Sequence, residues 1–113
     1  MERRFGAAGD QWLDEADLGS VPVSTVLGAL ADPARLEIVH RLAERGEASC
    51  TSLGLPLSPS TVTHHLRILR ESGLIATRVK GTARLSHLRM AEMERRFPGL
   101  LPAILGAPAA RQP

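Results

Sequence analysis

The segment from residue 58 to residue 73, SPSTVTHHLRILRESG, constrains the fold of this chain more than any other stretch. It predicts one helix with a clear beginning and end. Ser58 is a favourable N-cap residue, and Pro59 fits the first helical position, where the missing N–H costs nothing. Gly73 can adopt the left-handed conformation that ends a helix. We therefore expect a helix that begins at Pro59 and ends close to Gly73.

The predicted helix has two different faces, because successive residues are about 100° apart around its axis. Val62, Leu66 and Leu69 share an apolar side, and His65 flanks it. The opposite arc carries hydroxyl, imidazole and guanidinium groups, from Ser60, Thr63, His64, Arg67 and Arg70. Such a face can enter the major groove of DNA, where Ser, Thr and His reach base edges and Arg holds bases or phosphates. An ordinary solvated amphipathic helix is the alternative.

After Gly73 the pattern changes from helical to alternating. Residues 74–89 predict two strands joined by a turn at Lys80-Gly81. A two-stranded ribbon is marginal alone, so it must pack on helices. Its tip carries Arg78, Lys80 and Arg84 and no acidic residue. A basic tip of this kind can contact phosphates or the minor groove, although a merely solvated hairpin is the alternative. Its position directly behind the candidate reading helix favours the DNA interpretation.

Two further helices are predicted before this region, over residues 24–31 and from Pro33 to Gly46. Asp32-Pro33 is a strong start signal, since it combines an N-cap acceptor with proline in the first turn. The second helix is expected to place five side chains in the core: Leu36, Ile38, Val39, Leu42 and Ala43. Residues 47–57 have room for only one or two helical turns. A short helix there, followed by a tight turn and the long helix, predicts a helix-turn-helix arrangement.

Both ends of the chain are expected to contribute apolar helices. Asp10 to Leu18 predicts a short acidic helix, and residues 90–105 predict helical spacing that is interrupted at Pro98. The C-terminal segment is too apolar to stand alone, so with residues 10–31 it is the predicted surface for a second copy. The candidate interface residues are Trp12, Leu13, Val26, Leu27, Leu30, Met93, Phe97, Leu100, Leu101 and Ile104. We expect one domain over residues 10–105, with flexible tails at 1–9 and 106–113.

The charge distribution indicates a polyanionic partner. The formal net charge of +2 hides an uneven arrangement, because residues 58–89 carry six basic residues and one acid. Residues 1–57 carry five arginines and nine acids. Local charge, rather than the total, is the footprint of a nucleic-acid partner. The single Cys50 fits a reducing cytosol, and no apolar run approaches the ~20 residues that span a bilayer. No catalytic triad order, phosphate-binding glycine loop or metal-hydrolase spacing indicates an enzyme.

Two stretches, LGALADPARLEI at residues 27–38 and STVTHHLRILRESGLI at residues 60–75, resemble the ArsR/SmtB family of dimeric bacterial winged-helix transcription regulators. The resemblance covers about residues 24–89. It implies that Ser60, Thr63 and His64 occupy DNA-reading positions, and that Lys80 and Arg84 lie on the wing. It also implies two reading helices facing a palindromic site. The full set of expected DNA-binding residues is Ser60, Thr61, Thr63, His64, Arg67, Arg70, Arg78, Lys80 and Arg84.

The same resemblance implies two places for a metal effector. The family's thiolate site pairs two cysteines one residue apart. Here Ser49 and Thr51 occupy those positions around Cys50, which makes a poor site for arsenic, cadmium or lead. The other common site uses His, Asp and Glu at the dimer interface. The candidates in this chain are His87, Glu92, Glu94, Asp14 and Asp17. Nitrogen and oxygen ligands favour nickel, zinc or cobalt, so nickel or zinc is the expected effector if one is used.

We therefore expect a mainly α protein with a small β-hairpin (α+β): a winged helix-turn-helix that dimerises through its N- and C-terminal helices. The expected function is a cytoplasmic, sequence-specific DNA-binding regulator, most often a repressor in this family. It would bind double-stranded DNA as a homodimer, require no cofactor and bind no membrane. The alternatives are a metal-independent winged-helix regulator and a protein-interaction module that acts through the apolar terminal helices.

Overall fold

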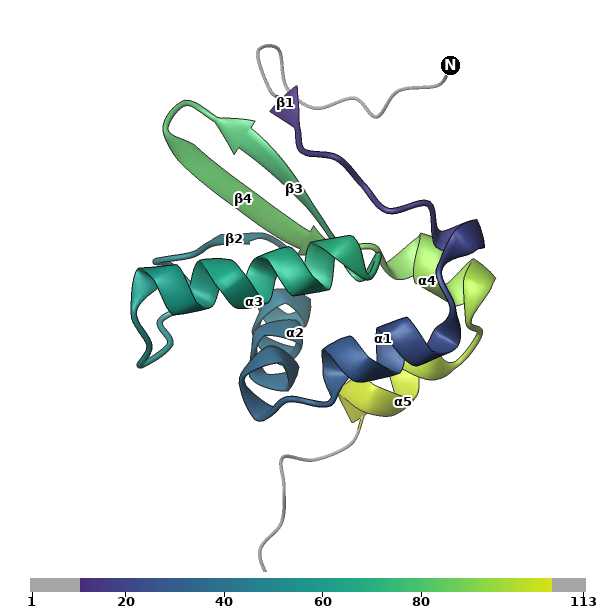
Figure 1. Cartoon of the computed structure of the whole chain (residues 1–113). Helices are drawn as coiled ribbons and strands as arrows, with labels where there is room; N and C mark the ends of the chain where they lie inside the picture. Colours follow the sequence, from purple (N-terminus) through teal and green to yellow (C-terminus); the bar gives the residue numbers. More distant parts are fainter. Residues whose placement is uncertain (1–10, 107–113) are drawn as a thin grey trace, which may run out of the picture.

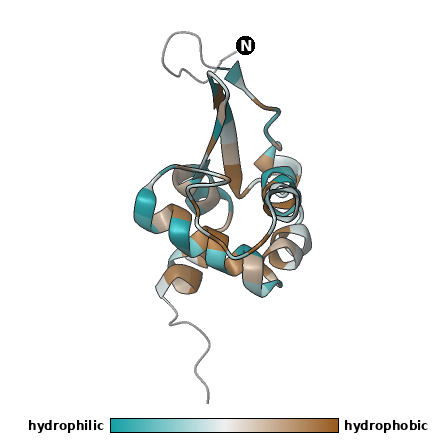
Figure 2. Cartoon of the chain, turned by 90° about the vertical axis from the view of Figure 1, so that its left-hand side faces the viewer, coloured by the Kyte–Doolittle hydropathy of each residue, from teal (hydrophilic) through white to brown (hydrophobic). Residues whose placement is uncertain are grey.

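A computed structural model describes residues 11–106 of the chain. Its elements are, in order, β1 (Gln11–Trp12), the 3-10 turn η1 (Leu18–Ser20), α1 (Val23–Leu30), α2 (Pro33–Arg45), β2 (Ala48–Ser49), α3 (Pro59–Glu71), β3 (Ile75–Lys80), β4 (Ala83–Leu88), α4 (Met90–Arg96) and α5 (Leu100–Gly106). The β3–β4 hairpin projects away from the group of helices in both views of the chain (Figure 1, Figure 2). The predicted architecture, mainly helical with one hairpin, is confirmed.

Helix α3 begins and ends where the sequence predicts. The hydroxyl of Ser58 accepts the N–H of Thr61 at 3.3 Å, so the N-cap is formed as expected. The chain leaves the helix through Gly73, whose φ is +88°. On the inner side of α3, Val62 and Leu69 are buried. This burial fixes which side of α3 remains available to solvent.

The segment between α2 and α3 differs from the prediction of a short helix. Ala48 and Ser49 form the strand β2, which pairs with β4. The N–H of Leu53 then donates to the Ser49 carbonyl at 3.1 Å and the N–H of Gly54 to the Thr51 carbonyl at 3.2 Å, so the segment forms turns rather than a helix. Arg41 of α2 donates to the Leu53 carbonyl at 2.6 Å. The backbone polar groups of this short segment are thus satisfied by β4 and by α2, so a helix is not needed to satisfy them.

The strands form one antiparallel sheet in the order β1-β3-β4-β2. The two predicted hairpin strands are confirmed, with Ile75 paired to Leu88 at the base and Lys80 paired to Ala83 at the tip. The connecting residues are 81 and 82, one position later than the predicted turn. Ile75 and Leu88 are buried, which seats the base of the ribbon on the helices.

The predicted acidic helix from Asp10 to Leu18 is wrong over the described residues 11–18. Gln11 and Trp12 pair with β3 instead, and the chain runs on without helix to η1. Two arginines hold this segment by its carbonyl groups: Arg89 donates to Ala16 at 2.8 Å, and Arg96 donates to Leu18 at 2.9 Å. A helix of this length is marginal in water. The open edge of β3 and these two guanidinium groups satisfy the backbone better.

The core lies between the helices and the base of the hairpin. Of the five core residues predicted on α2, Ile38, Val39 and Leu42 are buried and Leu36 is partly buried against them. Ala43 is exposed, because the buried stripe of α2 is narrower than its apolar pattern suggests. The predicted tails lie outside the described residues, apart from Gly106, which is the last residue of α5.

None of the helices within residues 11–106 has the length and apolar content needed to cross a bilayer.

Candidate nucleic-acid interface

The outward face of α3 presents polar side chains to solvent. Ser60, Thr61, Thr63, His64 and Arg67 are all exposed, and Arg70 in the last turn is partly buried. These residues come from consecutive turns of one helix, so they form a continuous polar strip. Hydroxyl, imidazole and guanidinium groups can form hydrogen bonds with base edges, and guanidinium and hydroxyl groups can donate to phosphate oxygens.

The tip of the hairpin supplies two free cations beside α3. Lys80 and Arg84 are exposed. Arg78 differs from its predicted place at the tip, since its guanidinium binds Glu47 through Nε–Oε2 at 2.7 Å and Nη2–Oε1 at 2.8 Å. Only 17% of the Arg78 side chain is exposed. The arginine therefore braces the hairpin against the segment that precedes β2, because its charge is already matched by a carboxylate.

The ion pair with Arg78 also lowers the pKa of Glu47. Hydrogen bonds from Arg78 hold the pKa of Glu47 below its ordinary value, against the opposing effect of partial burial. The positive charge of Arg78 itself and of other basic groups nearby adds to the lowering. Glu47 therefore stays ionised at neutral pH, and the ion pair is fully formed there.

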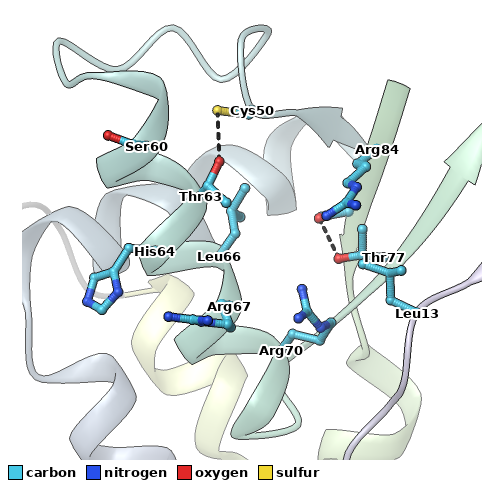
Figure 3. A pocket seen from close by; sticks show the side chains of 11 residues that line it. Leu13, Cys50, Ser60, Thr63, His64, Leu66, Arg67, Arg70, Thr77 and Arg84 are labelled. Carbon is cyan, nitrogen blue, oxygen red and sulfur yellow. Dashed lines mark hydrogen bonds between the residues drawn. The ribbon is translucent and has the colours of Figure 1, made fainter. Parts of the chain in front are cut away.

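A cleft of about 430 Å³ lies between α3 and the hairpin. Figure 3 shows Ser60, Thr63, His64 and Arg67 on the α3 side, with Thr77 and Arg84 across from them on the hairpin. Arg70 lies at the lower end of the cleft in this view, and Cys50 and Leu13 complete its rim. The structure thus brings together predicted DNA-binding residues from two separate elements, α3 and β4.

Helix α3 is anchored from behind by Arg35 of α2, which sequence reasoning did not identify. Arg35 Nε donates to the Ala29 carbonyl at 2.6 Å, and its Nη1 lies 3.1 Å from Nδ1 of His65. Because a guanidinium can only donate, Nδ1 of His65 must be the acceptor. The backbone N–H of Arg35 also donates to the N-cap carboxylate of Asp32 at 3.1 Å, and this hydrogen bond is the main cause of the lowered pKa of that carboxyl. The only sequence feature that could have indicated this role for Arg35 is its position three residues after the N-cap aspartate Asp32.

Hydroxyl groups hold the turn before α3, at the two positions where the resemblance noted above would imply thiolates. Ser49 Oγ lies 3.3 Å from Thr51 Oγ1 and 3.1 Å from Ser52 Oγ. Cys50 is partly buried, and its Sγ lies 3.6 Å from the Pro59 carbonyl oxygen. This turn therefore offers one thiol and several neutral oxygens, which is an unfavourable donor set for a thiophilic ion.

The structure describes all five candidate metal ligands. They are His87, Glu92, Glu94, Asp14 and Asp17. The ring of His87 meets that of Trp12 edge to face at 5.5 Å, Glu94 accepts the Gly99 N–H at 3.2 Å, and Asp17 accepts the Gly19 N–H at 3.1 Å. Across residues 11–106, no three His, Cys, Asp or Glu side chains form a group that could hold a metal ion.

The residues predicted for the dimer interface do not form one exposed surface in the structure. Four of its residues have no surface to offer a second copy, because at most 5% of each is exposed: Val26, Leu30, Met93 and Leu101. Trp12 belongs to β1, which pairs with β3, and the N–H of Leu13 donates to the Thr77 carbonyl of β3; Figure 1 shows β1 at the hairpin, away from α1 and α5. Leu27 is 48% exposed, and Phe97, Leu100 and Ile104 are partly buried. Val23 is 47% exposed on the same helix as Leu27, and sequence reasoning missed it.

Comparisons with known proteins agree with this geometry. Residues 30–78 match a family model described as a helix-turn-helix domain. The chain is 34% identical over 79 residues to an uncharacterised HTH-type transcriptional regulator, YceK, of Bacillus subtilis, and the match covers 67% of this chain and 79% of that protein. It is 39% identical over 56 residues to the arsenical resistance operon repressor of Bacillus subtilis, covering 48% of this chain and 53% of the repressor.

A solved structure supports the same assignment. The crystal structure of an ArsR family transcriptional regulator matches this chain with a TM-score of 0.58 and 25% sequence identity. The match covers 73% of this chain and 81% of the other. The matched proteins are transcription regulators rather than enzymes. With the polar face of α3, the basic hairpin and these likenesses together, the chain belongs to the ArsR-type winged helix-turn-helix family of DNA-binding transcription regulators.

Proposed function

We propose that this protein is a repressor that binds a palindromic operator as a homodimer, with α3 in the major groove and the hairpin against the backbone. The observation that carries the proposal is the juxtaposition of an exposed polar strip on α3 with a basic hairpin tip across one cleft. With such a target, the proposed location of the protein is the bacterial cytoplasm.

The proposal divides the exposed residues into two roles. Ser60, Thr61, Thr63 and His64 lie in the first half of α3, which is the part of a recognition helix that contacts base edges. Arg67, Arg70, Lys80 and Arg84 supply phosphate contacts, and these make the affinity fall with salt. Each good base contact is expected to contribute about 1–3 kcal/mol of discrimination against the wrong base.

The homodimer is proposed to form through α1 and the C-terminal helices. Leu27 and Val23 expose about half of their surface on α1, at the end of the molecule opposite the hairpin tip (Figure 1). Two-fold pairing through this end would present two copies of α3 to two half-sites about one helical turn apart. A palindromic operator follows from that symmetry.

The proposed effector, nickel or zinc, would bind residues from two copies. Within residues 11–106 of one copy, no three His, Cys, Asp or Glu side chains form a group that could hold a metal ion. The metal-independent regulator is therefore the simpler form of the proposed function.

Fluorescence anisotropy with the DNA upstream of the protein's own gene and with a random duplex tests the proposal. Both titrations are run at one fixed salt concentration, first with a chelator and then with zinc or nickel. We expect tight binding to the upstream DNA and weak binding to the random duplex. A shift with metal would establish a metal-responsive regulator. Equal, weak binding to both duplexes would reject the proposed function and favour a protein-interaction module that acts through the terminal helices.

A further inference from the structure

Residues 11–22 connect two distant parts of the molecule, and we name them the N-terminal strap. The strap begins as β1 on the edge of β3, near the tip of the hairpin, where Gln11 pairs with Val79. It ends where α1 begins, at Val23. Figure 1 shows it running from the hairpin past α4 to α1. The strap therefore joins the hairpin, which the proposed function places against DNA, to the helices at the other end of the molecule.

The first part of the strap is held by the sheet. The N–H of Leu13 extends the pairing of β1 by donating to the Thr77 carbonyl at 2.9 Å. The ring of Trp12 meets the ring of His87 edge to face, at a centroid distance of 5.5 Å. Because His87 lies on β4, the strap contacts both strands of the hairpin. A two-stranded ribbon is marginal by itself, so a third strand on its edge limits how far the hairpin can move.

The rest of the strap is held by two guanidinium groups, from the first and last turns of α4. Arg89, the residue before α4, donates to the Ala16 carbonyl at 2.8 Å. Arg96, the last residue of α4, donates to the carbonyls of Leu18 and Val21 at 2.9 and 3.1 Å. Hydrogen bonds from a charged donor are stronger than those between neutral groups. The strap is therefore fastened to α4 at three of its carbonyl groups.

Arg95, the neighbour of Arg96 on α4, makes no such contact. It is exposed and forms no hydrogen bond or ion pair within residues 11–106. Arg96 is exposed as well, although its guanidinium reaches the strap. Neither arginine lines the cleft between α3 and the hairpin. The two residues carry the same charge at consecutive positions, so a comparison between them isolates the contact with the strap.

We infer that the strap positions the hairpin for DNA binding, and that Arg89 and Arg96 are positioning residues for this purpose. The inference rests on the proposed placement of the hairpin against the DNA backbone. A hairpin that is already held in place loses less conformational freedom when Lys80 and Arg84 contact phosphates, so the complex is tighter. Release of the strap should therefore lower DNA affinity without removing any contact between the chain and DNA.

Trp12 is the one tryptophan of the chain, so its fluorescence reports directly on the strap. Quenching by acrylamide, which is uncharged, is measured without DNA for wild type, for Arg96→Gln and for the matched control Arg95→Gln. Arg96 is replaced rather than Arg89, because Arg89 is only 7% exposed and its loss would disturb the core. We expect stronger quenching of Trp12 in Arg96→Gln than in wild type, and no change in Arg95→Gln.

Fluorescence anisotropy with labelled upstream DNA at several salt concentrations gives the effect on binding. We expect Arg96→Gln to bind roughly three- to tenfold more weakly than Arg95→Gln. The slope of log affinity against log salt should be the same for both. Lys80→Gln is the comparison for a lost phosphate contact, which lowers that slope by about 1. A lower slope in Arg96→Gln than in Arg95→Gln would indicate a direct DNA contact and overturn the positioning role.

Leu13→Pro releases the other end of the strap without changing any charge, because proline has no N–H to donate to Thr77. Leu13→Ala keeps this N–H and is the control. Urea unfolding shows that each variant is folded before its DNA binding is measured. We expect Leu13→Pro to resemble Arg96→Gln in Trp12 quenching and in DNA affinity, and Leu13→Ala to change less in both.

The inference is overturned if Arg96→Gln and Leu13→Pro bind DNA as tightly as their controls, even where Trp12 is quenched more strongly. It is also overturned if Arg96→Gln and Arg95→Gln weaken binding equally, because that result indicates a general effect of charge. Both results leave the proposed function standing, since wild type still prefers its upstream DNA to a random duplex. A wild type that binds both duplexes equally and weakly would reject the proposed function and, with it, the positioning role.

Discussion

Arg78 of the hairpin and Glu47, which precedes β2, form a two-point ion pair with N–O distances of 2.7 and 2.8 Å. The pair joins β3 of the hairpin to the segment between α2 and α3. It therefore ties the hairpin to the chain that leads into α3. An arginine that looks like a DNA contact in the sequence thus acts as a brace.

Glu47→Gln should lower stability at pH 7 by about 1 kcal/mol, because it leaves Arg78 without its counter-charge. The pKa of Glu47 is lowered in the folded chain, so the pair stabilises the protein above the ordinary value of 4.5 and is lost as pH falls below it. Urea unfolding at pH 7 and pH 3.5 measures this. The difference between wild type and Glu47→Gln should be smaller at pH 3.5. A difference that stays constant with pH would contradict the assignment.

Arg35→Ala should destabilise the protein by about 1–2 kcal/mol, because Ala29 and His65 both lose a hydrogen-bond partner. A double-mutant cycle with His65→Ala isolates the contact between α2 and α3. We expect a coupling of about 0.5–1.5 kcal/mol in urea unfolding. Strictly additive losses would mean that the contact contributes nothing to holding α3.

Gly73→Ala should destabilise the chain by about 2–3 kcal/mol for two reasons. Its φ of +88° is unfavourable for alanine, and the added Cβ would overlap the side chain of Leu18. Thermal unfolding of the single variant and of Gly73→Ala/Leu18→Ala separates the two causes. The double variant should be more stable than the sum of the two single losses implies. Simple additivity would show that the overlap is not the cause.

Leu27→Arg should convert the proposed dimer into a monomer without unfolding it, because nearly half of this side chain is exposed in one copy. Leu57→Arg is the matched control: Leu57 is 40% exposed, in the segment just before α3. Light scattering after size-exclusion chromatography gives the mass of each. Monomers for both variants, or dimers for both, would reject α1 as the interface.

The long helices α2 and α3 could be predicted from the sequence because their signals are local, whereas the short helix expected between them is not formed. The caps at Ser58 and Asp32 and the helix end at Gly73 depend on one or two neighbouring residues, and all three are formed. The apolar side chains of α3 recur at a spacing that places them on one side only if the segment is a helix. Such features do not depend on where the rest of the chain lies, so a single sequence is enough to find them.

The predictions that were wrong concern residues whose structure depends on partners distant in the sequence. The strand at Gln11–Trp12 exists because the edge of β3 is available, and Arg89 holds Ala16 from 73 positions away. The role of Arg78 depends on an acid 31 positions earlier. The predicted dimer surface failed at Val26 for the same reason, since an apolar side chain on a helix does not reveal whether its own chain covers it. No local pattern carries this information.

The central claim is that the exposed strip of α3 reads DNA sequence, and the most direct test is the specificity ratio of His64→Ala. His64 is exposed, so its removal should not disturb the fold. Fluorescence anisotropy gives the ratio of affinities for the protein's upstream DNA and for a random duplex, at one salt concentration, for wild type and variant. We predict that the ratio falls roughly tenfold, with little change in binding to random DNA. An equal loss on both duplexes, or no loss on either, would contradict the account.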